Sequence, residues 1–173
     1  MTAPDMDALN AMSGPRLRAL AARGSDAAQV QACFEDAQDY FVLTEGKLPA
    51  KDAAIHLLAD AEVDDHRRVF LLVSHSGGPA VGVLDLYLDY PEPFSAQIGL
   101  LLLRESCRGL GYGKETTAAL EAALVSAGYR ALRLSVIEKN VGARAFWDRL
   151  GFATVGHLDG GATLYEKVLR RSR

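Results

Sequence analysis

The chain has 173 residues, of which 49% are hydrophobic and 24% are charged, a composition typical of one globular domain with a sizeable core. Its formal net charge of -3 argues against a general nucleic-acid-binding protein. The two cysteines are far apart in sequence, which argues against a disulfide framework. The chain has no signal-peptide pattern at its start and no apolar stretch as long as a membrane span. We therefore expect a soluble, cytoplasmic protein without a nucleic-acid or membrane partner.

The first third of the chain is expected to contain a leader, one strand and two helices. Residues 1–14 are small and polar, so they predict a flexible leader in front of a single domain at residues 15–173. Residues 16–21 alternate between apolar and polar and predict a strand. Residues 27–39 and 51–61 have the apolar spacing of helices.

Residues 40–49 form an aromatic stretch that we expect to be a loop. One interpretation is that Phe41 and Leu43 hold this loop against the core. The other is that the loop forms a wall of a substrate pocket, since loops on a rigid scaffold often carry binding residues. The sequence favours neither interpretation.

A β-hairpin is predicted where residues 69–74 and 80–89 form strands around a Ser-Gly-Gly-Pro turn. Because alternate side chains of a strand share a face, one face of the second strand is aliphatic and the other becomes acidic and aromatic. The second of these faces carries Val81, Val83, Asp85, Tyr87 and Asp89. We expect residues 96–103 to return antiparallel to this strand.

The stretch from Gln97 to Gly113 predicts a strand followed by an anion-binding loop. An apolar run at residues 98–103 indicates a buried strand, and the glycine-rich loop at residues 108–113 leads directly into a helix. The first turn of a helix has unpaired N–H groups and the positive end of the helix dipole. Glycines, among them Gly111, let a phosphate approach that backbone closely.

The rest of the chain completes one mixed sheet. Residues 131–136 predict a strand parallel to residues 98–103, residues 143–150 predict a helix, and residues 152–168 predict a final hairpin. This order of elements is typical of an α+β domain in three layers, with helices flanking a mixed, mostly antiparallel sheet.

Two segments, in this order, resemble the motifs of GNAT acetyltransferases. Arg108-Gly-Leu-Gly-Tyr-Gly fits the pattern Arg/Gln-x-x-Gly-x-Gly/Ala, and Asn140-x-x-Ala-x-x-Phe-Trp-x-x-Leu-Gly-Phe fits the family's later segment. The resemblance covers roughly residues 15–168, taken as one domain. It implies a GNAT-type sheet with splayed parallel central strands. It also implies an N-acetyltransferase that moves the acetyl group of acetyl-CoA to a primary amine of a small molecule or peptide by direct attack.

By this resemblance, acetyl-CoA binds across the strand and the glycine-rich loop. The pantetheine arm pairs with backbone groups of the strand, and an N–H group at about Leu100 polarises the thioester carbonyl. Loop N–H groups hold the pyrophosphate, Arg108 adds a charged contact, and Asn140 either bonds the arm or simply caps its helix. The expected cofactor-binding residues are Leu100, Leu102, Arg108, Gly109, Leu110, Gly111, Tyr112, Gly113, Lys114, Asn140 and Phe146.

The residues for proton transfer depart from the family pattern. Trp147 stands where the family usually has a tyrosine that protonates the departing thiolate, and an indole N–H cannot do so at neutral pH. Either solvent supplies this proton or another hydroxyl does, the candidates being Ser135, Tyr87 and Tyr112. Gln97 stands where many relatives carry a glutamate base.

We therefore predict Asp85, Asp89 and Tyr87 as the catalytic residues, on the polar face of the second hairpin strand. Asp85 lies deeper in that strand and is the first candidate for a base, acting directly or through water. Glu45 is a weaker third acid. The alternative is that these carboxylates only keep an exposed sheet face soluble.

A second interpretation of the whole chain is an acyl-CoA-binding sensor or interaction module with little or no turnover. A dinucleotide-binding domain fits less well, because the glycine-rich loop comes late in the chain and Glu138 is too distant for the ribose-binding acid. The four histidines have no metal-ligand spacing, so we predict no metal site. The oligomeric state stays open, although domains of this family often form homodimers.

Overall fold

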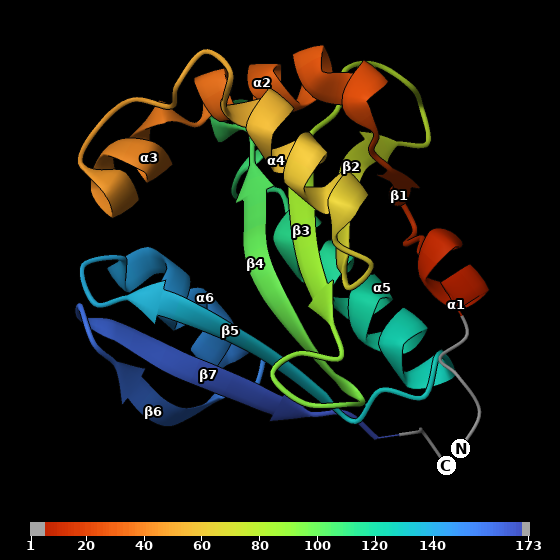
Figure 1. The fold of residues 1–173 in the computed structure, drawn as a ribbon, viewed down its shortest axis with the longest axis vertical. Coiled ribbons are helices and arrows are strands. Elements are labelled where there is room, and N and C mark those ends of the chain that lie inside the picture. The colour runs from red at the N-terminus through yellow and green to blue at the C-terminus, as the bar shows by residue number, and fades with distance from the viewer. Residues whose placement is uncertain (1–5, 171–173) are drawn as a thin grey trace.

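The computed structural model describes residues 6–170, which form one seven-stranded sheet with helices on both faces (Figure 1). The strands are β1 (Leu17–Ala21), β2 (Arg67–Ser74), β3 (Gly82–Leu88), β4 (Ser95–Leu103), β5 (Ala131–Ile137), β6 (Ala153–Leu158) and β7 (Ala162–Val168). The α-helices are α1 (Met6–Asn10), α2 (Ala27–Asp36), α3 (Gln38–Glu45), α4 (Ala53–Val63), α5 (Tyr112–Ser126) and α6 (Val141–Arg149). The predicted α+β class is confirmed.

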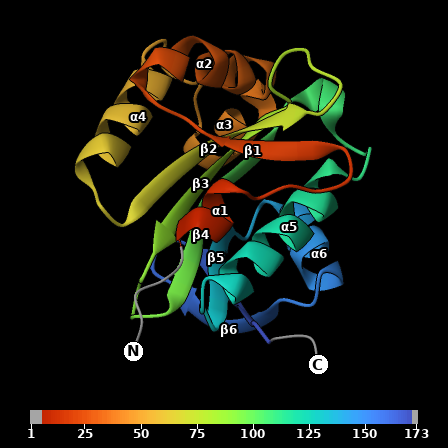
Figure 2. The same ribbon diagram turned by 90° about the vertical axis from the view of Figure 1, so that its right-hand side faces the viewer.

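The sheet has the strand order β1-β2-β3-β4-β5-β7-β6. Neighbouring strands are antiparallel except for β4 and β5, which are parallel because the α5 crossover connects them. Helices α1, α5 and α6 lie against one face, and α2, α3 and α4 cover part of the other (Figure 2). This is the mixed, mostly antiparallel sheet that the sequence predicts.

The two parallel strands splay apart, as expected. They pair only over Ser95–Ile98 and Ala131–Leu134. Beyond these residues β4 and β5 diverge, so that the sheet opens into a V below α3 (Figure 1). Residues 99–103 of β4 therefore have no strand partner on their β5 side.

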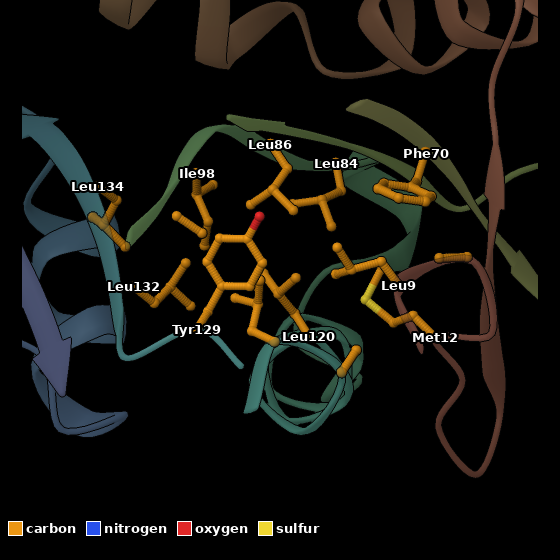
Figure 3. Close-up of a cluster of buried hydrophobic side chains, with 14 of the residues drawn as sticks. Leu9, Met12, Phe70, Leu84, Leu86, Ile98, Leu120, Tyr129, Leu132 and Leu134 are labelled. Carbon is orange, nitrogen blue, oxygen red and sulfur yellow. The ribbon is translucent and has the colours of Figure 1, made fainter. Parts of the chain in front are cut away.

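Two hydrophobic clusters hold the helices to the sheet. The larger lies between α1, α5 and α6 and one sheet face, and Figure 3 shows its centre. There Leu84 and Leu86 of β3 meet Leu120 of α5, and all three side chains are fully buried. The smaller cluster packs α2, α3 and α4 on the other face, where Val83 of β3 is fully buried. The predicted separation of the two β3 faces holds within the strand, whereas Val81 precedes β3 and packs into the larger cluster.

The N-terminal segment is not a loose leader where the structure describes it. Residues Met6–Asn10 form α1, and Leu9 (0% exposed) and Met12 (4% exposed) enter the larger cluster (Figure 3). The prediction is therefore wrong for residues 6–14, because apolar side chains of this segment, among them Leu9 and Met12, pack into the larger cluster against α5. Residues 1–5 lie outside the described residues.

The stretch expected as a loop is mostly helical. The helix predicted over residues 27–39 ends at Asp36, and a new helix, α3, begins at Gln38. The break falls at Ala37, whose φ of −119° and ψ of 40° lie outside the helical region. Phe41 of α3 is buried against Phe34 with ring centroids 5.1 Å apart, so α3 is held to the core.

Among the helices within residues 6–170, none combines the length and the apolar character that crossing a membrane requires.

Candidate active site

The splay of β4 and β5 is accompanied by a β-bulge in β4. Asp85 of β3 lies opposite Leu100, but Leu86 lies opposite Ile98, so Gly99 is the extra residue. A Cβ atom at Gly99 would lie 2.8 Å from Oδ2 of Asp85 and 2.8 Å from Cε2 of Tyr87. A side chain here would therefore displace Asp85 or Tyr87, and the bulge brings these two residues against the backbone where β4 leaves β5.

A cavity of about 910 Å³ occupies the opening of the V. Its walls come from the end of β4, the glycine-rich loop with the start of α5, the helix α6 and the helix α3. Tyr40 and Leu43 of α3 line it, so the aromatic stretch both packs on the core and forms a pocket wall. The remaining lining residues include Leu102, Arg108, Gly109, Gly111, Tyr112, Gly113, Lys114, Asn140, Phe146 and Trp147.

The glycine-rich loop exposes the N-terminus of α5 to this cavity. Gly109 and Gly111 have positive φ values of 73° and 83°, which turn the backbone into the helix. Gly113 packs beneath Phe146, where a Cβ atom would lie 3.1 Å from Cζ of that ring. The unpaired N–H groups of the first helical turn and the positive end of the helix dipole make this wall suited to an anion.

Arg108 lines the cavity but is already paired. Its Nη1 and Nη2 donate to the two carboxylate oxygens of Asp39 on α3, at 2.5 and 3.0 Å. Its Nε donates to the carbonyl oxygen of Leu103 at 3.2 Å. The hydrogen bonds from Arg108 lower the pKa of Asp39. A phosphate contact by Arg108 therefore competes with this ion pair.

Most of the expected cofactor-binding residues meet at the cavity. Asn140 lines it and also caps α6, because its Oδ1 accepts a hydrogen bond from the N–H of Ala143 at 3.1 Å. Leu110 does not line it; this residue is 54% exposed, and its carbonyl oxygen accepts a hydrogen bond from Arg16. The side chain of Leu100 packs towards the smaller cluster, opposite Asp85.

Asp85 and Tyr87 form a cluster with Arg67, the first residue of β2. Nε and Nη2 of Arg67 donate to the two oxygens of Asp85 at 2.9 and 2.8 Å. The Asp85 side chain is buried (4% exposed) and that of Arg67 is partly buried (14% exposed). The guanidinium carbon of Arg67 lies 4.9 Å from the centre of the Tyr87 ring. Strand alternation could have revealed Arg67, because it shares a face with the buried Val69 and Leu71.

The electrostatics of this cluster favour the protonated phenol. Burial raises the pKa of Tyr87, and the carboxylate of Asp85 raises it further. The hydrogen bonds to Asp85 likewise raise the pKa of Arg67. Tyr87 is thus a hydrogen-bond donor at neutral pH rather than a base.

Asp89 is not brought together with Asp85 and Tyr87. It lies in the turn after β3 with a φ of 53°, where Oδ1 accepts from the N–H of Phe94 at 2.9 Å and Oδ2 from the hydroxyl of Tyr129 at 3.5 Å. This turn adjoins Ser95, where β4 and β5 are still paired. Burial, followed by the charge of Asp89, raises the pKa of Tyr129 to about 12.

Among the candidates for protonating a thiolate, Tyr112 lies at the cavity. Trp147 is buried (6% exposed), lines the cavity and packs against Phe146 and Phe152 with ring centroids 4.8 and 5.0 Å away. Ser135 is exposed on β5. Within residues 6–170, no group of three or more His, Cys, Asp or Glu side chains is placed to hold a metal ion.

Known proteins share both the sequence pattern and the fold. The family model described as Acetyltransferase (GNAT) family matches residues 30–152. An acetyltransferase from Thermus thermophilus is 34% identical, and the superposition covers 88% of this chain and 97% of that chain with a TM-score of 0.82. The spermidine N-acetyltransferase from Vibrio cholerae, solved in complex with CoA and spermine, is 16% identical, with 88% and 95% of the two chains covered and a TM-score of 0.71.

A curated relative matches a shorter stretch. The 5-NmdU N-acetyltransferase of Pseudomonas phage PaMx11 is 40% identical over 60 residues, which is 35% of this chain and 41% of the phage protein. The match thus spans less than half of that relative. The family model covers most of this chain, including the bulged strand, the glycine-rich loop and α6. The chain therefore belongs to the acetyltransferase (GNAT) family.

Proposed function

We propose that this protein is an N-acetyltransferase that uses acetyl-CoA to acetylate a primary amine of a small molecule or peptide. The observation that carries the proposal is the 910 Å³ cavity, which joins the unpaired edge of β4 to the N-terminus of α5. An extended arm with amide groups fits the first feature, and a pyrophosphate fits the second. Acetyl-CoA carries both groups, because its pantetheine arm is joined directly to the pyrophosphate.

The chain supplies a binding group for each part of this substrate. Backbone N–H and C=O groups of residues 99–103 bind the pantetheine arm as an added strand would. The N–H groups of residues 111–114 bind the pyrophosphate, with the Lys114 side chain beside them. Phe146, which packs over Gly113, closes the cavity from the side of α6.

The chemistry is a direct transfer. The amine nitrogen attacks the thioester carbonyl carbon, a C–N bond forms, the C–S bond breaks, and the sulfur leaves as a thiolate that takes up a proton. The N–H group at about Leu100 stabilises the developing oxyanion. Asp85 accepts the proton of the amine, directly or through water, and Tyr87 donates a hydrogen bond beside it. Arg67 holds the carboxylate of Asp85 in place.

An amine acceptor is in keeping with the ligand of one similar protein and the name of another. The similar protein from Vibrio cholerae binds spermine, and the phage relative is named for N-acetylation of 5-NmdU. In this chain the acceptor reaches the bulge from the sheet face that carries Arg67, Asp85 and Tyr87, opposite the larger cluster. The carboxylate of Asp85 on that face attracts an ammonium group before it loses its proton.

The experiment is thiol release from acetyl-CoA with a broad panel of amines, including polyamines and peptides. We expect release with at least one amine in the wild-type protein. An Asp85→Asn variant that still binds CoA should lose most of this turnover. Binding without release for every amine would contradict the proposal and favour an acyl-CoA-binding module.

A further inference from the structure

We propose that Arg16, from the segment before β1, is a positioning residue for the phosphate-binding loop and sets the affinity for the phosphate end of acetyl-CoA. Arg16 lies outside both family motifs and more than ninety positions before the loop in sequence. This inference rests on the proposed function, because it concerns the same acetyl-CoA site.

The guanidinium of Arg16 contacts two residues of the loop, Leu110 and Tyr112, and fills the space beside Gly111 between them. Its Nη1 donates to the carbonyl oxygen of Leu110 at 2.9 Å. Its Nη2 lies 3.3 Å from the position that a Cβ atom of Gly111 would take. Its central carbon lies 4.5 Å from the centre of the Tyr112 ring, in cation–π contact. Arg16 therefore fixes the loop where the backbone enters α5.

Glu115, in the first turn of α5, holds Arg16 from the other side. Its Oε2 accepts from Nε of Arg16 at 2.8 Å, and its Oε1 accepts from the backbone N–H groups of Arg16 and Leu17 at 2.6 and 2.9 Å. A Cβ atom at Gly14 would lie 2.6 Å from Cγ of Glu115, so the chain wraps closely around this side chain. The start of β1 and the start of α5 are thus tied together through one carboxylate.

Glu115 makes the charge of Arg16 necessary for anion binding. The Glu115 side chain is 8% exposed. Burial alone would raise its pKa, but the hydrogen bonds from Arg16 and Leu17 outweigh burial and lower the pKa. The group is therefore an anion close to the wall that receives the pyrophosphate. Without the guanidinium, this anion repels the phosphates and the loop loses its anchor.

The test compares two acetyl donors, acetyl-CoA and S-acetylpantetheine, which lacks the phosphates. In Arg16→Gln we expect KM for acetyl-CoA to rise by roughly tenfold or more, with kcat and the KM for the amine unchanged. KM for S-acetylpantetheine should stay within about twofold of the wild-type value, because no phosphate is involved. Arg18→Gln, which alters an exposed arginine of β1, is the matched control and should change neither KM.

Two further variants separate charge from geometry. Arg16→Lys keeps the charge opposite Glu115 but not the planar guanidinium, so it should restore only part of the affinity for acetyl-CoA. It provides the same comparison should the glutamine variant not fold. Arg16→Gln combined with Glu115→Gln should bind acetyl-CoA more tightly than Arg16→Gln alone, since the repelling carboxylate is gone.

An unchanged KM for acetyl-CoA in Arg16→Gln overturns the inference, and so does an equal rise for both donors. In either case the wild-type protein still uses acetyl-CoA, and the proposed function stands. A wild-type protein that binds no acetyl-CoA contradicts the proposed function and this inference together.

Discussion

Arg67 donates two hydrogen bonds to Asp85, at 2.9 and 2.8 Å, directly beside the bulge at Gly99. The pair is largely buried, and it joins β2 to β3 on the sheet face opposite the larger cluster. Both oxygens of the carboxylate are thus held in a fixed orientation towards the point where β4 leaves β5. The orientation of Asp85 is thus set by a residue that lies 18 positions earlier in the chain.

The Arg67–Asp85 pair should contribute strongly to stability. Removing one partner leaves a buried, unpaired charge, so we expect Arg67→Met to lower the free energy of unfolding by about 3 to 5 kcal/mol. Urea denaturation measures this change. The exposed pair of His56 and Asp52 (72% and 59% exposed) is the control, and Asp52→Asn should cost about 1 kcal/mol or less. Similar losses of unfolding free energy in the two variants would show that the buried pair contributes no more to stability than the exposed pair.

Gly111→Asp should abolish the binding of acetyl-CoA. The substitution adds a negative charge at the N-terminus of α5, against the phosphates, in a backbone conformation with a φ of 83°. Calorimetry measures the affinity. Gly77→Asp is the matched control, because Gly77 has a φ of 85° and open space around it, but it lies in the β2–β3 turn. An affinity of Gly111→Asp equal to that of the control would refute a phosphate site at this loop.

Stability should fall as the pH rises from about 10 to about 12. Tyr129 has a pKa of about 12 in the fold against 10 for an ordinary tyrosine, so the folded protein holds this proton more tightly than the unfolded chain. Its contribution is complete below pH 10, and it is lost through this window, up to about 3 kcal/mol. Denaturation at several pH values checks this, with Tyr129→Phe as the comparison. An equal slope in both proteins would assign the loss to other groups.

Helix α1 should be part of the folding unit. Leu9 is fully buried against the larger cluster, so Leu9→Ala should cost about 2 to 5 kcal/mol of stability. Val63→Ala, at a side chain that is 86% exposed, should cost far less. Thermal unfolding of both variants, followed by circular dichroism, gives the comparison. Equal melting temperatures of Leu9→Ala and Val63→Ala would show that α1 does not contribute to the stability of the domain.

Features with local signals were predictable from the sequence. The glycine-rich loop, the capping Asn140 and the alternation of β3 depend on residues that are close together in the chain. The splay of β4 and β5 was predictable from the family resemblance. No local pattern in the sequence indicates the register in which the two strands pair. Helix α3 was mistaken for a loop because its side chains are aromatic and divided between the core and the cavity.

Features that depend on residues far apart in the chain could not be predicted from local sequence patterns. Arg67 meets Asp85 only because β2 and β3 pair in one register, and Arg16 meets Glu115 across 99 positions. The burial of Leu9 likewise depends on where α5 passes in space. Strand alternation indicates that Arg67 shares the face of Val69, but which residues pair across elements is set by the packed fold.

The most direct test of the proposed function is the transfer of a labelled acetyl group from acetyl-CoA to an amine, with product detection by mass spectrometry. We predict acetylated product from the wild-type protein with at least one amine, and none from Gly111→Asp at the same protein and donor concentrations. Acetyl-CoA binding by the wild-type protein without a labelled product from any amine would contradict the account.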